Sequence, residues 1–143
     1  MIVADTNLVV YAALAGDRTA TAARVRARDA DWVAPPLWCS EFRNALVQNV
    51  RHGRLTADQA AATWTTARDL VRNVDVDPLA VLDAAFAHTL SGYDAEFVAL
   101  ALALGVPLVT DDKGVLRACP GTAVSLDVFA AVAPPGPPDA PGR

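Results

Sequence analysis

Short apolar runs alternate along the chain with longer segments in which apolar residues recur at helical spacing. The short runs predict buried strands at residues 2–4, 31–34, 74–76, 106–110 and 124–126. The longer segments predict helices at residues 8–14, 19–28, 35–53, 56–72, 78–90, 93–104 and 128–132. Because strands alternate with helices throughout, we expect an α/β fold: a three-layer α/β/α sandwich with a mostly parallel central sheet.

The end of the chain has a different composition. Half of the residues from Pro134 to Arg143 are proline, a composition that does not form regular secondary structure. We therefore expect a single domain over residues 1–133, which is long enough to bury a core, and a disordered proline-rich tail over residues 134–143.

Four acidic residues lie at or just past the ends of apolar runs: Asp5, Glu41, Asp94 and Asp112. The carboxyl ends of parallel strands open on one crevice, so we expect these side chains to converge. Two unit charges about 5 Å apart repel each other by roughly 3 kcal/mol at an effective dielectric constant of about 20. A converged set is stable if it is protonated or holds a cation, and it therefore predicts a metal site.

Each of these acids also has a simpler structural explanation. Asp5 follows a strand and could cap the next helix. Glu41 could lie at the helix boundary and face solvent. Asp94 follows Ser91 by three residues, which is the spacing of a capping box. The adjacent pair at 111–112 could form a turn, with one member facing the crevice. The metal-site hypothesis therefore depends on the four acids together.

Composition narrows the choice of metal. Two cysteines and two histidines in 143 residues offer little for a zinc site, and neither cysteine has metal-type spacing. Oxygen ligands suit Mg²⁺ or Mn²⁺. No apolar run is long enough to span a bilayer, and the N-terminus lacks the features of a signal peptide, so we expect a cytoplasmic protein with no membrane partner.

The net charge of −4 does not by itself suggest nucleic-acid binding, but the charge is unevenly distributed. Residues 18–72 contain nine arginines and five acids, a net charge of +4. Arginine suits bidentate contacts with phosphate. The candidates for RNA-backbone contacts are Arg24, Arg26, Arg28, Arg43 and Arg51.

Four segments resemble the PIN-domain ribonucleases, and within them the VapC-type toxins of bacterial toxin–antitoxin pairs. They are Ile2-Val3-Ala4-Asp5-Thr6-Asn7, Ser40-Glu41-Phe42-Arg43-Asn44-Ala45-Leu46, Tyr93-Asp94-Ala95-Glu96-Phe97-Val98-Ala99-Leu100-Ala101 and Leu108-Val109-Thr110-Asp111-Asp112. The similarity covers residues 1 to about 132, with the segments in the order and spacing of the family.

The resemblance implies an endoribonuclease dependent on Mg²⁺ or Mn²⁺ that cleaves RNA by metal-activated water. It implies that Asp5, Glu41, Asp94 and Asp112 are catalytic, with Asp5 and Asp94 as the main metal ligands. It also selects Asp112 over Asp111. Asn7 and Thr110 would support the site. A small VapB-like antitoxin and a homodimer are the partners that the resemblance implies.

Two other functions compete with this one. A phosphotransfer receiver or an aspartate-nucleophile phosphatase also carries acids at strand ends. The order of residues argues against both, because the acid pair comes late in the chain and Asn7 stands where the phosphatase pattern needs an acid. A catalytically silent PIN-like module that binds RNA or protein is the other alternative, although an idle acid cluster would destabilise its fold.

Overall fold

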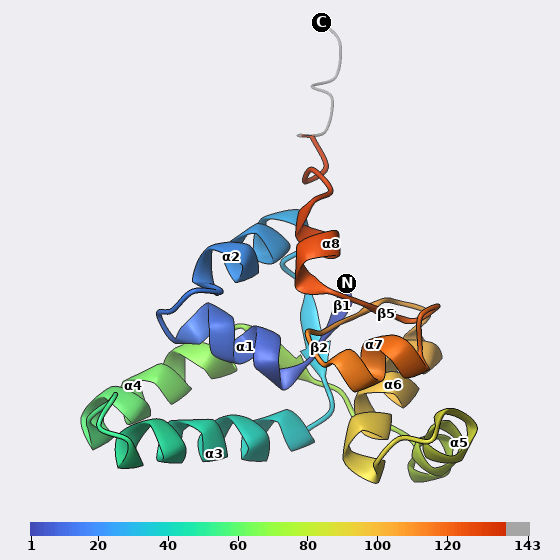
Figure 1. Ribbon diagram of the computed structural model, residues 1–143, viewed down its shortest axis with the longest axis horizontal. Coiled ribbons are helices and arrows are strands. Elements are labelled where there is room, and N and C mark those ends of the chain that lie inside the picture. The colour runs from blue at the N-terminus through green and yellow to red at the C-terminus, as the bar shows by residue number, and fades with distance from the viewer. Residues whose placement is uncertain (137–143) are drawn as a thin grey trace, which may run out of the picture.

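A computed structural model describes residues 1–136 as one sheet covered by helices (Figure 1). The strands are β1 (Ile2–Ala4), β2 (Trp32–Ala34), β3 (Val71–Asn73), β4 (Leu108–Val109) and β5 (Ala123–Val124). The helices are α1 (Thr6–Ala13), α2 (Thr19–Arg28), α3 (Leu37–Arg51), α4 (Ala57–Arg68), α5 (Pro78–His88), α6 (Gly92–Leu104), α7 (Lys113–Ala118) and α8 (Leu126–Ala130).

The strand order is β3-β2-β1-β4-β5, and every pairing is parallel. From β1 the chain builds outward through β2 and β3, and then crosses back to place β4 on the other side of β1. The boundary between β1 and β4 is thus a topological switch point, where open α/β sheets form a crevice at the carboxyl ends of their strands. The predicted three-layer α/β/α sandwich is confirmed.

The central strands are buried because helices cover both faces of the sheet, which explains why they read as continuous apolar runs. All residues of β1, β2 and β4 are at most 1% exposed. Beside them, the rings of Trp38 and Phe42 on α3 pack with Trp64 on α4, and the centroids of Trp38 and Trp64 lie 5.6 Å apart. This aromatic cluster fixes the position of α3, the helix that carries Glu41.

The third strand lies earlier than the predicted 74–76. Helix α4 ends at Arg68 rather than near Arg72, and β3 pairs with β2 from Val71 to Asn73. Only Val71 of the three is buried, because β3 is an edge strand. A strand with one buried residue has almost no hydrophobic pattern, so the sequence directed the prediction to the two valines that follow.

The end of the domain also differs from the prediction. A short helix, α7, follows β4 directly, although Gly114 in its first turn weakens the sequence signal for a helix. The strand predicted at 124–126 lies at Ala123–Val124, since Ser125 caps α8 by accepting a hydrogen bond from the Val128 amide. The last helix consequently begins at Leu126 rather than Val128.

Residues 134–136, the first part of the predicted tail, belong to no helix or strand. The rest of that predicted segment, 137–143, lies outside the described residues. Among residues 1–136, no helix is both long enough and apolar enough to cross a membrane. Cys39 and Cys119 are free thiols.

Candidate metal and catalytic site

The ends of β1 and β4 place Asp5 beside Thr110. The two strands are neighbours, and each side chain comes directly after its strand. The Thr110 hydroxyl is buried and donates to Asp5 Oδ2 at 2.5 Å. The Asn7 amide donates to Thr110 Oγ1 at 3.3 Å and lies 3.5 Å from Asp5 Oδ2. Asn7 and Thr110, predicted as supporting residues, therefore both contact the Asp5 carboxylate.

Asp5 is also the N-cap of α1. Its Oδ1 accepts a hydrogen bond from the Thr6 amide at 2.7 Å. Asp5 therefore does cap the helix, as its simpler structural explanation proposed. The cap is compatible with a role in the site, because Oδ2 points toward Thr110. The cap orients the carboxylate over the carboxyl edge of the sheet.

Glu41 reaches the same region from α3. Glu41 is exposed as a residue, but its carboxylate lies in a partly buried contact in which Oε1 accepts a hydrogen bond from the hydroxyl of Thr6 at 2.8 Å. Thr6 is 8% exposed and is a site residue that the sequence interpretation missed. Thr6 could have been predicted from its position between Asp5 and Asn7 at the start of a helix, because a hydroxyl there faces the helix that carries Glu41.

Asp94 and Asp112 complete the cluster. The amide of Asp94 donates to the Ser91 hydroxyl at 3.1 Å, so Ser91 caps α6 as the spacing predicts. The return bond of a capping box, from the Ser91 amide to the Asp94 carboxylate, is not formed. A hydrogen bond with the Ser91 side chain instead acts to lower the pKa of the Asp94 carboxyl. Asp112 is the N-cap of α7, where Oδ1 accepts from the Val115 amide at 2.9 Å.

The charges of the acids act on one another. Burial raises the pKa of the Asp5 carboxyl to about 6, hydrogen bonds from Thr110 and the Thr6 amide oppose the shift, and the charges of Glu41 and Asp94 add to it. Burial also raises the pKa of Glu41, to which the charges of Asp94 and Glu96 contribute.

Asp94 behaves in the same way. Burial raises its pKa, and the charge of Asp112 raises it further. No lysine or arginine forms an ion pair with Asp5, Glu41, Asp94 or Asp112 within residues 1–136. The charge of Asp94 thus acts on Asp5 and Glu41, and that of Asp112 acts on Asp94, without an ion pair to offset the repulsion.

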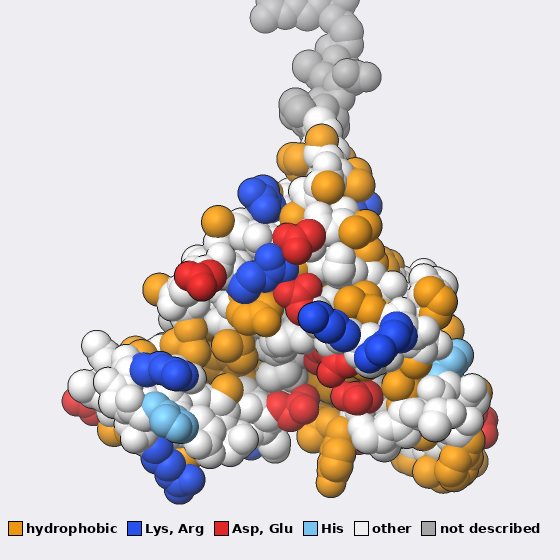
Figure 2. Space-filling view, viewed as in Figure 1, with side chains coloured by type: hydrophobic (Ala, Val, Ile, Leu, Met, Phe, Trp, Pro, Cys, Tyr) orange, Lys and Arg blue, Asp and Glu red, His pale blue; other side chains and the backbone are white. Residues whose placement is uncertain are grey.

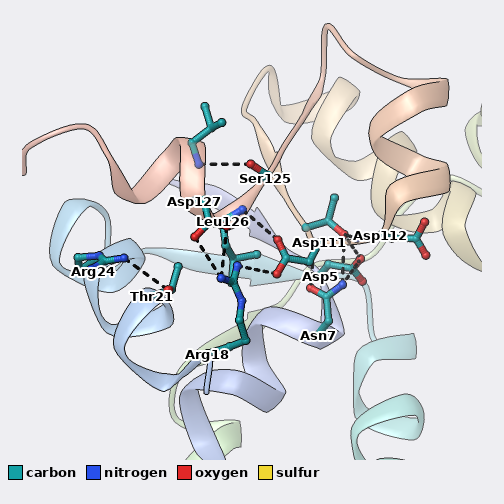
Figure 3. Close-up of polar contacts among 12 residues, drawn as sticks. Asp5, Asn7, Arg18, Thr21, Arg24, Asp111, Asp112, Ser125, Leu126 and Asp127 are labelled. Carbon is teal, nitrogen blue, oxygen red and sulfur yellow. Dashed lines mark hydrogen bonds and ion pairs between the residues drawn. The ribbon is translucent and has the colours of Figure 1, made fainter. Parts of the chain in front are cut away.

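Asp111 takes no part in this cluster. Figure 3 shows Asp111 and Asp112 pointing in opposite directions from the end of β4. Asp111 Oδ2 accepts from Arg18 Nη2 at 2.7 Å. The choice of Asp112 over Asp111, which the family resemblance implied, therefore agrees with the direction in which each side chain points.

The donor set suits a hard divalent cation, since it consists of carboxylate and hydroxyl oxygens. No three acidic, histidine or cysteine side chains of the described residues lie close enough together to enclose an ion by themselves. Mg²⁺ is commonly bound through one or two carboxylates, with water and substrate phosphate as its other ligands. The residues therefore fit an ion that Asp5 and Asp94 would hold in an open coordination shell.

The three predicted RNA-contact arginines on α2 make structural contacts. Arg26 packs over the Trp32 ring at 5.2 Å. Arg28 Nη1 donates to the Phe129 carbonyl at 2.9 Å. Arg24 Nη2 donates to the Thr21 hydroxyl at 3.4 Å, and Figure 3 shows Arg24 far from Asp5 and Asp112.

Arg43 and Arg51 border a different feature, an apolar groove of about 490 Å³ between α3 and α4. Arg43 follows Glu41 by two residues, about 200° around the helix, so the two side chains point to opposite sides. The other groove residues are apolar: Leu46, Val47, Val50, Ala57, Ala60, Ala61 and Trp64.

Two basic residues that the sequence interpretation did not select lie closer to the acids. Lys113 and Arg117 are exposed, occupy positions i and i+4 of α7, and directly follow the Asp112 cap. Figure 2 shows the basic side chains over α7 next to the acidic side chains at the centre of this face. They were missed because α7 itself was not predicted.

Comparison with known proteins agrees with this architecture. The model of the PIN domain matches residues 2–119. The crystal structure of PAE2754 from Pyrobaculum aerophilum is similar over 90% of this chain and 91% of that one, with a TM-score of 0.73 and 21% identity, which supports a common fold. No curated protein matches the sequence. The chain belongs to the PIN-domain family.

Proposed function

We propose that the protein is a divalent-metal-dependent endoribonuclease. PIN domains are commonly nucleases that use divalent metal ions. The observation that carries the proposal is the acid cluster at the switch point, in which Asp5, Glu41 and Asp94 all have raised pKa values. An enzyme that kept this cluster without a cation would lose stability at neutral pH.

The proposed roles follow from the contacts. Asp5 and Asp94 hold the ion, and Thr110 and Asn7 orient the Asp5 carboxylate. Glu41 is oriented by Thr6. When bound, a divalent ion neutralises phosphate charge and lowers the pKa of water. The hydrolysis adds the oxygen of water to phosphorus, breaks one phosphorus–oxygen bond of the RNA backbone and transfers a proton to the departing ribose oxygen.

We propose Lys113 and Arg117 as the principal contacts to the RNA backbone, ahead of the arginines on α2. A polyanion approaching an acidic cluster needs cations beside it, and the α7 pair lies next to Asp112. Arg26 and Arg28 already pack against Trp32 and Phe129. Arg24 remains a secondary candidate.

The VapC-type toxin role is proposed from the sequence resemblance, with a small VapB-like antitoxin as the partner. The groove between α3 and α4 supports this proposal, because it is apolar along its length and has Arg43 and Arg51 at its edges. An amphipathic segment with acidic side chains would match both features. In this proposal Arg43 and Arg51 contact the antitoxin, with RNA contact as the alternative.

The proposed homodimer has a second surface available to it. Leu79, Leu82 and Phe86 on α5 are 67%, 49% and 80% exposed. Phe86→Glu should convert a dimer to a monomer in light scattering if this face joins the two copies. An unchanged mass would place the interface elsewhere.

The activity is tested with RNA, Mn²⁺ or Mg²⁺, and the variant Asp94→Asn. Cleavage should require the ion, stop with a chelator, and fall by at least about 10³-fold in Asp94→Asn, equivalent to the several kcal/mol that a metal contributes to a transition state. Asp58→Asn, on the exposed start of α4, is the matched control. Incorporation of ¹⁸O from labelled water into the product phosphate identifies water as the nucleophile.

The alternative of a silent RNA- or protein-binding module predicts a different result. Wild type and Asp94→Asn would bind RNA equally and neither would cleave it. Ion-dependent cleavage that is equal in both proteins would contradict the role assigned to Asp94.

A further inference from the structure

Arg18 stands in an unusual position for a helix. It is the residue before the first turn of α2, where a positive charge faces the positive end of the helix dipole, and its side chain makes no cap. Its guanidinium instead extends to two carboxylates: Nη2 donates to Asp111 Oδ2 at 2.7 Å, and Nη1 donates to both oxygens of Asp127 at 3.1 and 3.3 Å. Helix stability does not explain this arginine.

Asp111 connects this arginine to the catalytic edge of the sheet. Its Oδ1 accepts from the amide of Leu126, the first residue of α8, at 3.3 Å. Its own amide donates to Asn7 Oδ1 at 3.4 Å. Asp111 thus joins the end of β4 to the starts of α1, α2 and α8, as Figure 3 shows.

The segment that Arg18 holds through Asp111 carries two groups of the acid cluster. Thr110, before Asp111, donates to Asp5. Asp112, after it, donates its amide to Thr110 Oγ1 at 3.0 Å and faces away from Arg18. Because adjacent residues point in opposite directions here, an ion pair that fixes Asp111 on one side also fixes Asp112 on the other.

We propose that Arg18 is a positioning residue for the metal site. Its ion pair with Asp111 sets the direction of the 110–112 segment, so that Thr110 contacts Asp5 and Asp112 faces Asp94. The pair also neutralises Asp111, which would otherwise add a fifth negative charge close to the cluster. This inference rests on the proposed metal-dependent activity, and it assigns Arg18 no contact with RNA or with the ion.

The test compares Arg18→Met and Arg18→Lys with Arg68→Met. Arg68 is an exposed α4 residue whose ion pair is a 3.9 Å contact with its neighbour Asp69, so its substitution removes the same charge without touching the network. Mn²⁺ binding is measured by calorimetry, and kcat and KM are measured on an RNA oligonucleotide. The melting temperature of each variant establishes that it is folded during the assay.

In Arg18→Met we expect Mn²⁺ affinity and kcat each to fall by about 10-fold or more, the usual effect of removing a group that orients a metal ligand. KM for RNA should change by less than about 2-fold, since the proposal gives Arg18 no contact with RNA. Arg18→Lys should recover part of the loss, because it keeps one charged contact with Asp111. Arg68→Met should match wild type.

Equal Mn²⁺ affinity and kcat in Arg18→Met and Arg68→Met would overturn the proposal, as would a change confined to KM. If Arg18→Met does not fold at the assay temperature, Asp127→Asn replaces it: a smaller loss in Mn²⁺ affinity supports the proposal, and no loss overturns it. A wild-type protein that binds Mn²⁺ but does not cleave RNA would contradict the proposed function alone, because the calorimetric comparison would still apply.

Discussion

Two groups of acids meet at the adjacent residues Asp111 and Asp112, and they differ in whether an arginine pairs with them. Asp111 and Asp127 share the guanidinium of Arg18. Asp5, Glu41, Asp94 and Asp112 form no ion pair with a basic side chain in the described part of the chain. The role of an acidic residue here therefore follows from its partner rather than from its position in the sequence, since Asp111 and Asp112 are adjacent.

The contrast also has an energetic side. A carboxylate that is paired with a cationic side chain stabilises the folded protein by a modest amount. A buried carboxylate without such a partner reduces the stability until a cation binds. Substitutions in the two groups should therefore change stability in opposite directions.

The largest such effect is expected at Asp5. Because the folded-state pKa of Asp5 is about 6, ionisation at neutral pH costs folding free energy. Asp5→Asn should raise the free energy of unfolding of the metal-free protein by about 3 kcal/mol at pH 7, since the pKa is raised from 3.8 to about 6 and each pKa unit corresponds to about 1.4 kcal/mol. Urea unfolding in the presence of a chelator measures this change, and a destabilised variant would contradict it.

The opposite effect is expected at Asp111. Asp111→Asn should lower the free energy of unfolding by about 1 kcal/mol, because it breaks a partly buried charge-assisted contact with Arg18. The same urea experiment compares it with Asp69→Asn, whose contact with Arg68 is exposed. If Asp111→Asn and Asp5→Asn shifted stability in the same direction, the distinction between the two groups would fail.

The stability of the metal-free protein should also depend on pH through Asp5. The pKa of Asp5 is raised in the folded state, so the folded protein binds more protons than the unfolded chain between about pH 4 and pH 6. Lowering the pH from 7 to 5 should therefore stabilise the metal-free wild type by about 1 kcal/mol relative to Asp5→Asn. Saturating Mn²⁺ should abolish this difference, whereas an equal pH response of the two proteins would argue against an ionisable Asp5.

The smallest effect is expected on α7. Lys113→Ala and Arg117→Ala should each raise KM for RNA by about 3- to 10-fold, leave kcat nearly unchanged, and reduce the slope of log affinity against log salt by about one. Arg68→Ala is the control. If Arg24→Ala raised KM for RNA by the same factor and the two α7 variants did not, the RNA contacts would be assigned to α2 instead.

The sequence was sufficient to predict the fold because its strands are buried on both faces and its helices have strong start signals. A capping box of Thr56 and Gln59 starts α4, and helix α2 has the predicted bounds. The failures have a common cause: β3 and α7 are short elements whose pattern is too weak to detect. Tertiary pairing with β2 fixes β3, and the cap by Asp112 fixes α7.

The acid cluster itself could be predicted from the positions of Asp5 and Asp112 after their strands. Its supporting contacts could not, because they join distant parts of the chain. The hydrogen bond between Thr6 and Glu41 spans 35 positions, and the ion pair between Arg18 and Asp111 spans 93. The predicted RNA contacts depended on composition alone, which does not reveal that Arg26 and Arg28 pack on aromatic rings.

The most direct test of the central claim is a calorimetric titration of Mn²⁺ into the metal-free protein at pH 7, carried out on wild type, Asp5→Asn and Asp58→Asn. We expect saturable binding to wild type and Asp58→Asn, and loss of binding in a folded Asp5→Asn. Binding that is unchanged in Asp5→Asn, or absent from wild type, would contradict the claim that the acids at the switch point hold a divalent ion.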